Sequence, residues 1–170
     1  MAYHADSSHL DDKEILTWEG FGLAQRELAQ MIADSGFNPT LVIAVARGGM
    51  IPAGALSYSL GVKPSDAINV EFYTDVGKTL PDPVVLAPML DPASLVDSRI
   101  LVVDDVVDSG RTLAVVVDLL REEGAENVKS AVLYGKSTSV IEPDYVWRRT
   151  DKWIVFPWSA EPPVQPGQPG

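Results

Sequence analysis

The sequence contains no cysteine and only two histidines, and its basic residues are few. Without cysteine there is no disulfide bond, thiolate metal site or cysteine nucleophile. Thirteen Lys and Arg stand against 24 Asp and Glu, a formal net charge of −11, which argues against nucleic-acid and anionic-membrane partners. No apolar run approaches the roughly 18 residues that span a bilayer, and the acidic start is unlike a targeting segment. We expect a cytoplasmic protein without stable membrane insertion.

What is present is ordinary for a globular chain. The sequence has 170 residues, of which 46% are hydrophobic and 22% are charged, and this suits one domain rather than two. We expect a flexible N-terminus over residues 1–12, a folded domain over residues 13–160 and a disordered tail over residues 161–170. The tail is rich in proline and glycine, which cannot build a core.

Helical and strand patterns alternate along the domain. Apolar periodicity and caps predict helices over residues 18–35, 52–60 and 112–123. Continuous apolar runs predict buried strands over residues 41–46, 67–73, 100–103 and 128–134, and short edge strands near 145–147 and 153–156. The alternation predicts an α/β fold, a single domain with a mostly parallel open sheet flanked by helices. Residues 74–88 hold Gly77 and several prolines and are predicted to be a long functional or mobile loop.

The strongest chemical signal lies over residues 100–113. Asp104 and Asp105 follow a buried strand, where their mutual repulsion requires a metal ion, hydroxyl donors or open water. The turn predicted over residues 104–110 leads into a helix, and its free N–H groups, the Gly110 backbone and nearby hydroxyls would form a phosphate cradle. Together these features predict a receptor for a sugar phosphate. A receiver-type phosphoacceptor would also explain the acid pair, but not the segment from Ser109 to Thr112.

Residues 102–113 resemble the phosphoribosyl-pyrophosphate (PRPP) signature of type I phosphoribosyltransferases. Residues 43–53 resemble the pyrophosphate loop of that family. Residues 134–136 and 153–158 are similar to the purine end of the bacterial xanthine–guanine (6-oxopurine) phosphoribosyltransferases. The resemblance covers roughly residues 40–158.

The resemblance implies roles for the residues that would bind PRPP. Asp104 and Asp105 would bind the ribose hydroxyls directly or through Mg²⁺, which makes them the expected metal ligands. Asp108 would lie near the purine N7 as the catalytic acid or base and would also contact PRPP. The 5-phosphate and the pyrophosphate would be held mainly by backbone N–H groups and one guanidinium, at Ser109, Gly110, Arg111, Thr112, Arg47, Gly48 and Gly49. A cis peptide bond is expected between Ala46 and Arg47.

The same resemblance implies how the base would be recognised. Lys136 would bond the purine 6-oxo group, Trp153 would stack on the ring, and the backbone at Trp153 and Ile154 would read the 2-substituent. A tryptophan in an apolar segment would also suit a core or an interface. The long loop would correspond to a small hood region, with Tyr73 and Lys78 as candidates for closing over the pyrophosphate.

The expected function is purine salvage. The enzyme would transfer ribose 5-phosphate from PRPP to N9 of guanine, xanthine or hypoxanthine, depend on Mg²⁺, and act as a homodimer or homotetramer. One alternative is a phosphoribosyltransferase for another base, such as orotate, adenine or uracil. A second is a non-catalytic regulator of the same fold that binds PRPP, nucleotides and RNA; the net charge of −11 speaks against RNA.

Overall fold

The computed structural model describes residues 12–71, 74–75, 78–79, 84–86 and 93–167. Nearly all of the N-terminus expected to be flexible lies outside these residues, and so does Tyr73. Within the described part, no helix has both the length and the apolar character needed to cross a membrane.

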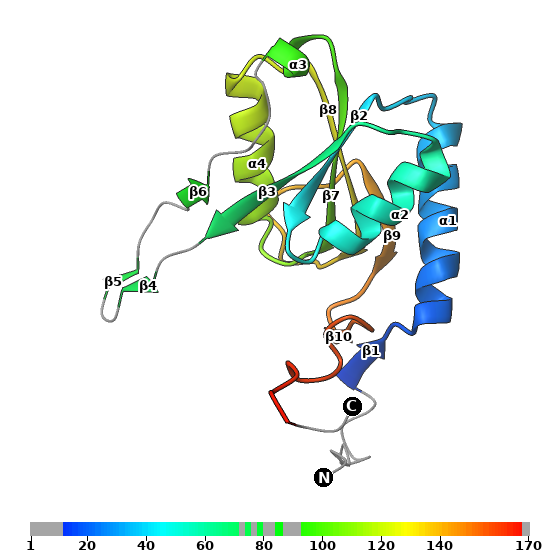
Figure 1. Ribbon diagram of the computed structural model, residues 1–170, viewed down its shortest axis with the longest axis vertical. Coiled ribbons are helices and arrows are strands. Elements are labelled where there is room, and N and C mark those ends of the chain that lie inside the picture. Colours follow the sequence, from blue (N-terminus) through cyan, green and yellow to red (C-terminus); the bar gives the residue numbers. More distant parts are fainter. Residues whose placement is uncertain (1–11, 72–73, 76–77, 80–83, 87–92, 168–170) are drawn as a thin grey trace.

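A six-stranded sheet forms the centre of the molecule, in the order β6-β3-β2-β7-β8-β9 (Figure 1). Five strands run parallel to one another: β2 (Leu41–Ala46), β3 (Ser65–Glu71), β7 (Arg99–Val107), β8 (Asn127–Gly135) and β9 (Tyr145–Arg149). The sixth, β6 (Val84–Leu86), is antiparallel to β3 at one edge. The mostly parallel sheet predicted from the sequence is confirmed, and β9 is the expected edge strand at the other side.

Helices cover both faces of this sheet. The helices α1 (Trp18–Asp34) and α2 (Met50–Leu60) pack on one face, and α4 (Arg111–Glu122) packs on the other (Figure 1). A short helix, α3 (Ala93–Val96), precedes β7. Along β2, Val42 and Ala44 belong to the core under α1 and α2, whereas Ile43 and Val45 belong to the core under α4. Both faces of the strand are buried, which explains its unbroken apolar sequence.

Two predicted boundaries around the acid pair were wrong. β7 continues to Val107, so Asp104 and Asp105 lie within the strand rather than in a turn. The reason is that β8 runs alongside it, and the pairing continues through Asp104 opposite Val132 and Val106 opposite Tyr134. The turn before α4 is therefore confined to residues 108–110.

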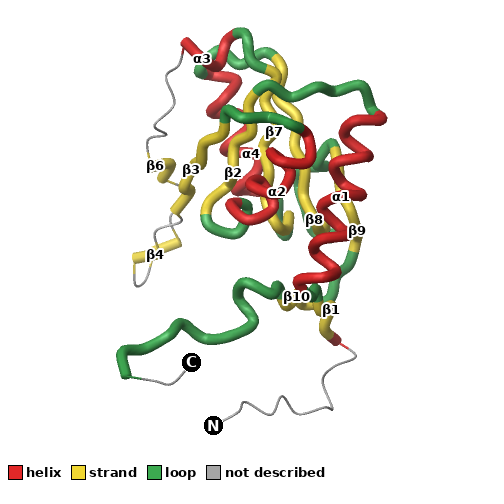
Figure 2. Tube along the Cα trace, turned by 45° about the vertical axis from the view of Figure 1, so that its right-hand side comes forward, coloured by secondary structure: helices red, strands yellow, loops and turns green. Residues whose placement is uncertain are grey.

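The segment near residue 153 was also misplaced by the sequence. β10 (Trp153–Val155) is not an edge of the central sheet; it pairs in parallel with β1 (Lys13–Ile15), which the sequence did not predict. Figure 2 shows this small pair below the start of α1, at the end of the molecule where the C-terminal segment also lies.

The predicted long loop contains regular structure. Within residues 74–88, β4 (Thr74–Asp75) and β5 (Lys78–Thr79) form an antiparallel pair outside the central sheet, and β6 joins the sheet. Short strands of two or three residues have too little periodicity to be recognised in a segment rich in proline.

Candidate active site

The carboxyl ends of β2, β7 and β8 bring most of the predicted site residues to one edge of the sheet, as the parallel topology requires, and β10 adds Trp153 and Ile154 from outside that sheet. Three neighbouring hollows lie there. The largest, a cleft of about 840 Å³, is lined by Arg47, Gly48 and Asp105. A hollow of about 100 Å³ lies over the turn before α4, and a third of about 240 Å³ lies between β8 and β10. Asp108 lines both of the smaller hollows.

The loop after β2 is built for close approach of the backbone. The Ala46–Arg47 peptide bond is cis, as expected. A Cβ atom on Gly48 would overlap the Asp105 carboxylate, and one on Gly49 would overlap the main chains of β2 and β7. Glycine is therefore required at position 49, whereas a side chain at position 48 would displace the Asp105 carboxylate or the loop. The Arg47 side chain is left exposed beside the cleft.

Asp104 and Asp105 form a partly buried acid pair. The Asp105 N–H donates to Asp104 Oδ1 at 2.8 Å. Burial, followed by the charge of Asp105, raises the pKa of Asp104 well above its ordinary value of 3.8. Burial also raises the pKa of Asp105, and this is partly offset by hydrogen bonds, including one from the Trp158 side chain. A cation or a pair of hydroxyl donors would relieve this unfavourable charge.

The donor set suits Mg²⁺ bound together with a substrate. Magnesium is commonly held by one or two carboxylates, with substrate oxygens and water completing its ligands. The described residues contain no cluster of three or more His, Cys, Asp or Glu that could hold a metal alone. The pair of Asp104 and Asp105 therefore fits a shared metal site and does not form a closed structural one.

The turn from Asp108 to Gly110 forms the cup before α4. Gly110 has a φ of +78° as the N-cap, and a Cβ there would lie 2.7 Å from Ile141 Cγ2. The turn is tied to the next loop, since Val140 N–H donates to the Ser109 carbonyl at 2.9 Å. Ser109, Gly110 and Thr112 line the hollow with Asp104 and Asp108. The Arg111 side chain is exposed and does not line it.

Lys136 and Asp108 face the same hollow, each from the residue that follows a strand, β8 and β7 respectively. Their charged atoms, Lys136 Nζ and Asp108 Oδ1, lie 3.9 Å apart, and the Lys136 side chain is only 16% exposed. The loop after Lys136 is held by Asp151, whose carboxylate accepts from the Ser137 N–H at 2.9 Å and from the Ser137 hydroxyl at 2.8 Å. These bonds, more than the nearby Lys136 charge, lower the pKa of Asp151.

The third hollow has an aromatic and apolar wall. Trp153 is 70% exposed and Ile154 is 9% exposed, and both line the hollow with Lys136 and Asp108. The structure adds wall residues that the sequence did not single out: Val106, Phe156 and Ser159. Their side chains reach the site only through tertiary packing. An apolar surface beside a cation and a carboxylate suits a flat, polar heterocycle.

Trp158 and the segment after it also line the large cleft. Trp158 stacks on Phe156 with ring centroids 4.9 Å apart, and Glu161, Pro162 and Pro163 continue the wall. The sequence assigned these last residues to the tail. The two hood candidates remain predictions, because Tyr73 lies outside the described residues and the Lys78 side chain is not described.

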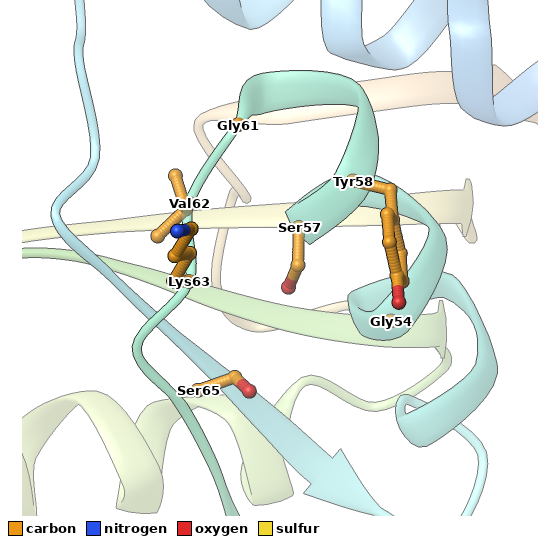
Figure 3. Close-up of a pocket in the computed structure, with 7 residues that line it drawn as sticks. All are labelled: Gly54, Ser57, Tyr58, Gly61, Val62, Lys63 and Ser65. Carbon is orange, nitrogen blue, oxygen red and sulfur yellow. The ribbon is translucent and has the colours of Figure 1, made fainter.

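A further groove, of about 480 Å³, lies away from this edge. It runs along the second half of α2 to the start of β3, at the amino-terminal side of the sheet. Ser57 and Tyr58 project from α2, and Ser65 lies across from them (Figure 3). None of the predicted site residues lines this groove.

A turn with free N–H groups at a helix start, an acid pair on the preceding strand and a glycine loop on its neighbour are features of an α/β protein of the phosphoribosyltransferase type. The chain belongs to the phosphoribosyl transferase domain family, whose model matches residues 11–165. It is 34% identical to a xanthine-guanine phosphoribosyltransferase from Idiomarina loihiensis, over 88% of this chain and 89% of that protein. A xanthine-guanine phosphoribosyltransferase from Gluconobacter oxydans is 30% identical, over 86% and 84% of the two chains.

Solved structures with a similar fold are also phosphoribosyltransferases. A purine phosphoribosyltransferase from Pyrococcus horikoshii superposes with a TM-score of 0.77 at 41% identity, over 91% of this chain and 98% of that one. The Helicobacter pylori xanthine-guanine-hypoxanthine phosphoribosyltransferase superposes with a TM-score of 0.74 at 25% identity, over 86% and 94%. The likeness therefore extends over most of the chain.

Proposed function

We propose that this protein transfers ribose 5-phosphate from PRPP to N9 of a 6-oxopurine, giving the nucleoside monophosphate and pyrophosphate. The observation that carries the proposal is the pairing of Lys136 with Asp108, 3.9 Å apart in a hollow walled by Trp153 and Ile154. That hollow adjoins the phosphate cup through Asp108. A base and a ribose phosphate in adjoining hollows would be in position to form a glycosidic bond.

The ribose phosphate would be held by three groups. Backbone N–H groups at Ser109 to Thr112 bind the 5-phosphate at the helix start, where the helix dipole favours negative charge. Asp104 and Asp105 accept hydrogen bonds from the ribose hydroxyls. Arg47, with the N–H groups of Gly48 and Gly49, binds the pyrophosphate. Asp104 and Asp105 would hold Mg²⁺ together with oxygens of PRPP, and the bound metal would supply positive charge beside the pyrophosphate.

The base would be oriented by the side chains of the third hollow. The Lys136 ammonium donates to the 6-oxo oxygen, and the exposed Trp153 ring stacks on the purine. Asp108 takes the proton from N7 as N9 bonds to C1 of the ribose and the bond from C1 to pyrophosphate breaks. Guanine, xanthine and hypoxanthine all carry the 6-oxo group that Lys136 would read.

We also propose that the chain assembles as a homodimer or homotetramer. Along α2, Met50, Gly54 and Tyr58 lie one turn apart on an exposed line, and Tyr58 is 93% exposed. Helices that are apolar on all sides are usually covered. Light scattering of the purified protein would give the number of chains directly.

The function is tested with a panel of bases. Pyrophosphate release is followed with PRPP and Mg²⁺ in the presence of guanine, xanthine, hypoxanthine, adenine, orotate or uracil. Turnover with the 6-oxopurines supports the proposal, and turnover with another base alone replaces it with the first alternative. If no base supports turnover, filter binding to RNA tests for the regulator.

A further inference from the structure

The Glu14 carboxylate lies outside the proposed site, yet it contacts side chains on β8 and β9. Glu14 Oε1 accepts a hydrogen bond from Arg148 Nη1 on β9 at 2.7 Å. The same oxygen accepts a longer one, of 3.5 Å, from the Tyr134 hydroxyl on β8. The Glu14 side chain is 22% exposed, so this is a partly shielded contact.

The backbone of the same residue joins a fourth strand. In the parallel pair of β1 and β10, Glu14 lies opposite Ile154, and its neighbours Lys13 and Ile15 lie opposite Trp153 and Val155. Leu16 N–H donates to the Val155 carbonyl at 3.0 Å, and the Leu16 side chain is buried in the core. Within the described residues, β1 is the only strand paired with β10.

These contacts lead directly to the base hollow. Tyr134 is fully buried and lies two residues before Lys136 on β8. Its ring packs edge-on against Phe156, with centroids 5.9 Å apart, and Phe156 lines the hollow. One carboxylate thus contacts the strand that carries Lys136, while its backbone aligns the strand that carries Trp153 and Ile154.

The ion pair between Glu14 and Arg148 is expected to add little to the stability of the fold. The Arg148 side chain is 52% exposed, and ion pairs with such exposure contribute little to stability. The contacts of Glu14 are better suited to aligning the strands around the hollow. An error of about 1 Å in the position of a substrate-binding group costs a large factor in rate or affinity.

We propose that Glu14 is a positioning residue for base recognition: by holding β10 against the end of β8, it sets the distance between the Trp153–Ile154 wall and Lys136. This inference rests on the proposed function, because it takes the hollow between β8 and β10 as the base site. Among the described residues, β1 pairs only with β10, and neither β7 nor β2, which carry the proposed PRPP-binding residues or lead into them, is paired with it.

The first test is a comparison of Michaelis constants. In Glu14→Ala we expect the KM for the purine to rise about ten-fold while the KM for PRPP changes by less than about two-fold. Glu14→Asp should recover part of the loss. The matched control is Glu27→Gln. The Glu27 carboxylate also accepts from β9, at 2.6 Å from Trp147 Nε1, but Glu27 lies in α1 and is not part of the strand that pairs with β10. It should leave both constants unchanged.

The second test does not depend on turnover. In amide hydrogen exchange, Glu14→Ala should speed exchange across residues 153–155 and leave the core strand β7 unchanged. An unchanged exchange rate in residues 153–155 would overturn the inference, and so would a rise in the KM for PRPP equal to that for the base. If the wild-type protein turns over no purine, the proposed function fails, and the exchange experiment still decides whether Glu14 holds β10.

Discussion

The Asp105 carboxylate lies so close to Gly48 that a Cβ on residue 48 would overlap it. Gly48→Ala must therefore displace the Asp105 side chain or push the pyrophosphate loop away from the acid pair. We expect kcat/KM for PRPP to fall by at least about ten-fold, since binding groups on the two elements lose their alignment. Steady-state kinetics with varied PRPP measures this change.

The matched control for that experiment is Gly22→Ala in α1. A Cβ at Gly22 has open space around it, and alanine favours a helix by about 0.5–1 kcal/mol over glycine. The control should raise thermal stability slightly and leave the kinetics unchanged. Equal kinetic losses in the two variants would show that the contact with Asp105 has no special role.

Asp108 is predicted to handle the N7 proton of the purine. Asp108→Asn keeps the shape of the side chain and removes its basicity, so kcat should fall by about 10²–10⁴ while PRPP affinity changes far less. Pre-steady-state turnover and equilibrium binding of PRPP measure the two quantities separately. Asp118→Asn on the exposed surface of α4 is the control. If PRPP affinity and turnover fell in parallel, Asp108 would be a binding residue and not the acid or base.

Lys136 is predicted to select 6-oxopurines. Lys136→Met removes the donor to the 6-oxo group, so kcat/KM for hypoxanthine should fall by about 10–100-fold, the range for a hydrogen bond to a charged group. Adenine lacks the 6-oxo acceptor and should lose little. Competition between the two bases measures the change in selectivity. Lys152→Met, an exposed lysine beside β10, should leave the selectivity unchanged, and a loss common to both bases would argue against the assignment.

The buried acid pair predicts a pH-dependent cost to stability. Because the pKa of Asp104 is raised in the folded chain above its unfolded value of 3.8, folding binds a proton there more tightly. The stability that this bound proton contributes is fully present below the unfolded pKa of Asp104, and it is lost as the pH rises through the folded pKa. At pH 7, Asp104→Asn should therefore raise the Tm of the metal-free protein, by about 2–4 °C for each kcal/mol recovered.

Thermal melts from pH 7 down to pH 4 test that sign. The Tm difference between Asp104→Asn and the wild type should shrink as the pH falls, because the wild-type carboxyl becomes neutral. A Tm gain independent of pH would assign the effect to packing instead of charge.

Magnesium dependence follows from the same pair. Removing divalent cations with a chelator should abolish pyrophosphate release, and added Mg²⁺ should restore it. In Asp105→Asn, the Mg²⁺ concentration for half-maximal rate should rise, since one of the two carboxylates is lost. A rate that survives chelation in the wild-type protein would contradict the metal role given to these residues.

Local patterns were enough for most of the architecture. The apolar run of β2 and the helix caps of α1 are short-range signals, and the structure has both elements where they were predicted. The motif from Asp104 to Thr112 is contiguous, so its parts are brought together by the chain itself. The end of β7 was the exception, because the pairing with β8 extends the strand past the acid pair.

Contacts between segments far apart in the chain could not be predicted from the sequence. The Trp158 side chain hydrogen-bonds to Asp105. Its ring also packs against Phe156 and against Trp18 and Phe21 in α1, so this aromatic cluster joins the two ends of the chain. No spacing rule links these residues, because their proximity depends on how α1 packs against the segment after β10.

The sequence by itself determined the α/β class, the acid pair and the turn before α4, because each depends on local patterns of residues. Only the tertiary structure decided which residues line the hollow beside Lys136. There, Glu14 meets Arg148 across 134 positions of the chain, and β10 takes β1 as its partner instead of joining the central sheet. Strand pairing and side-chain alignment over such separations are set by the packing of the whole core, which the local pattern of residues does not specify.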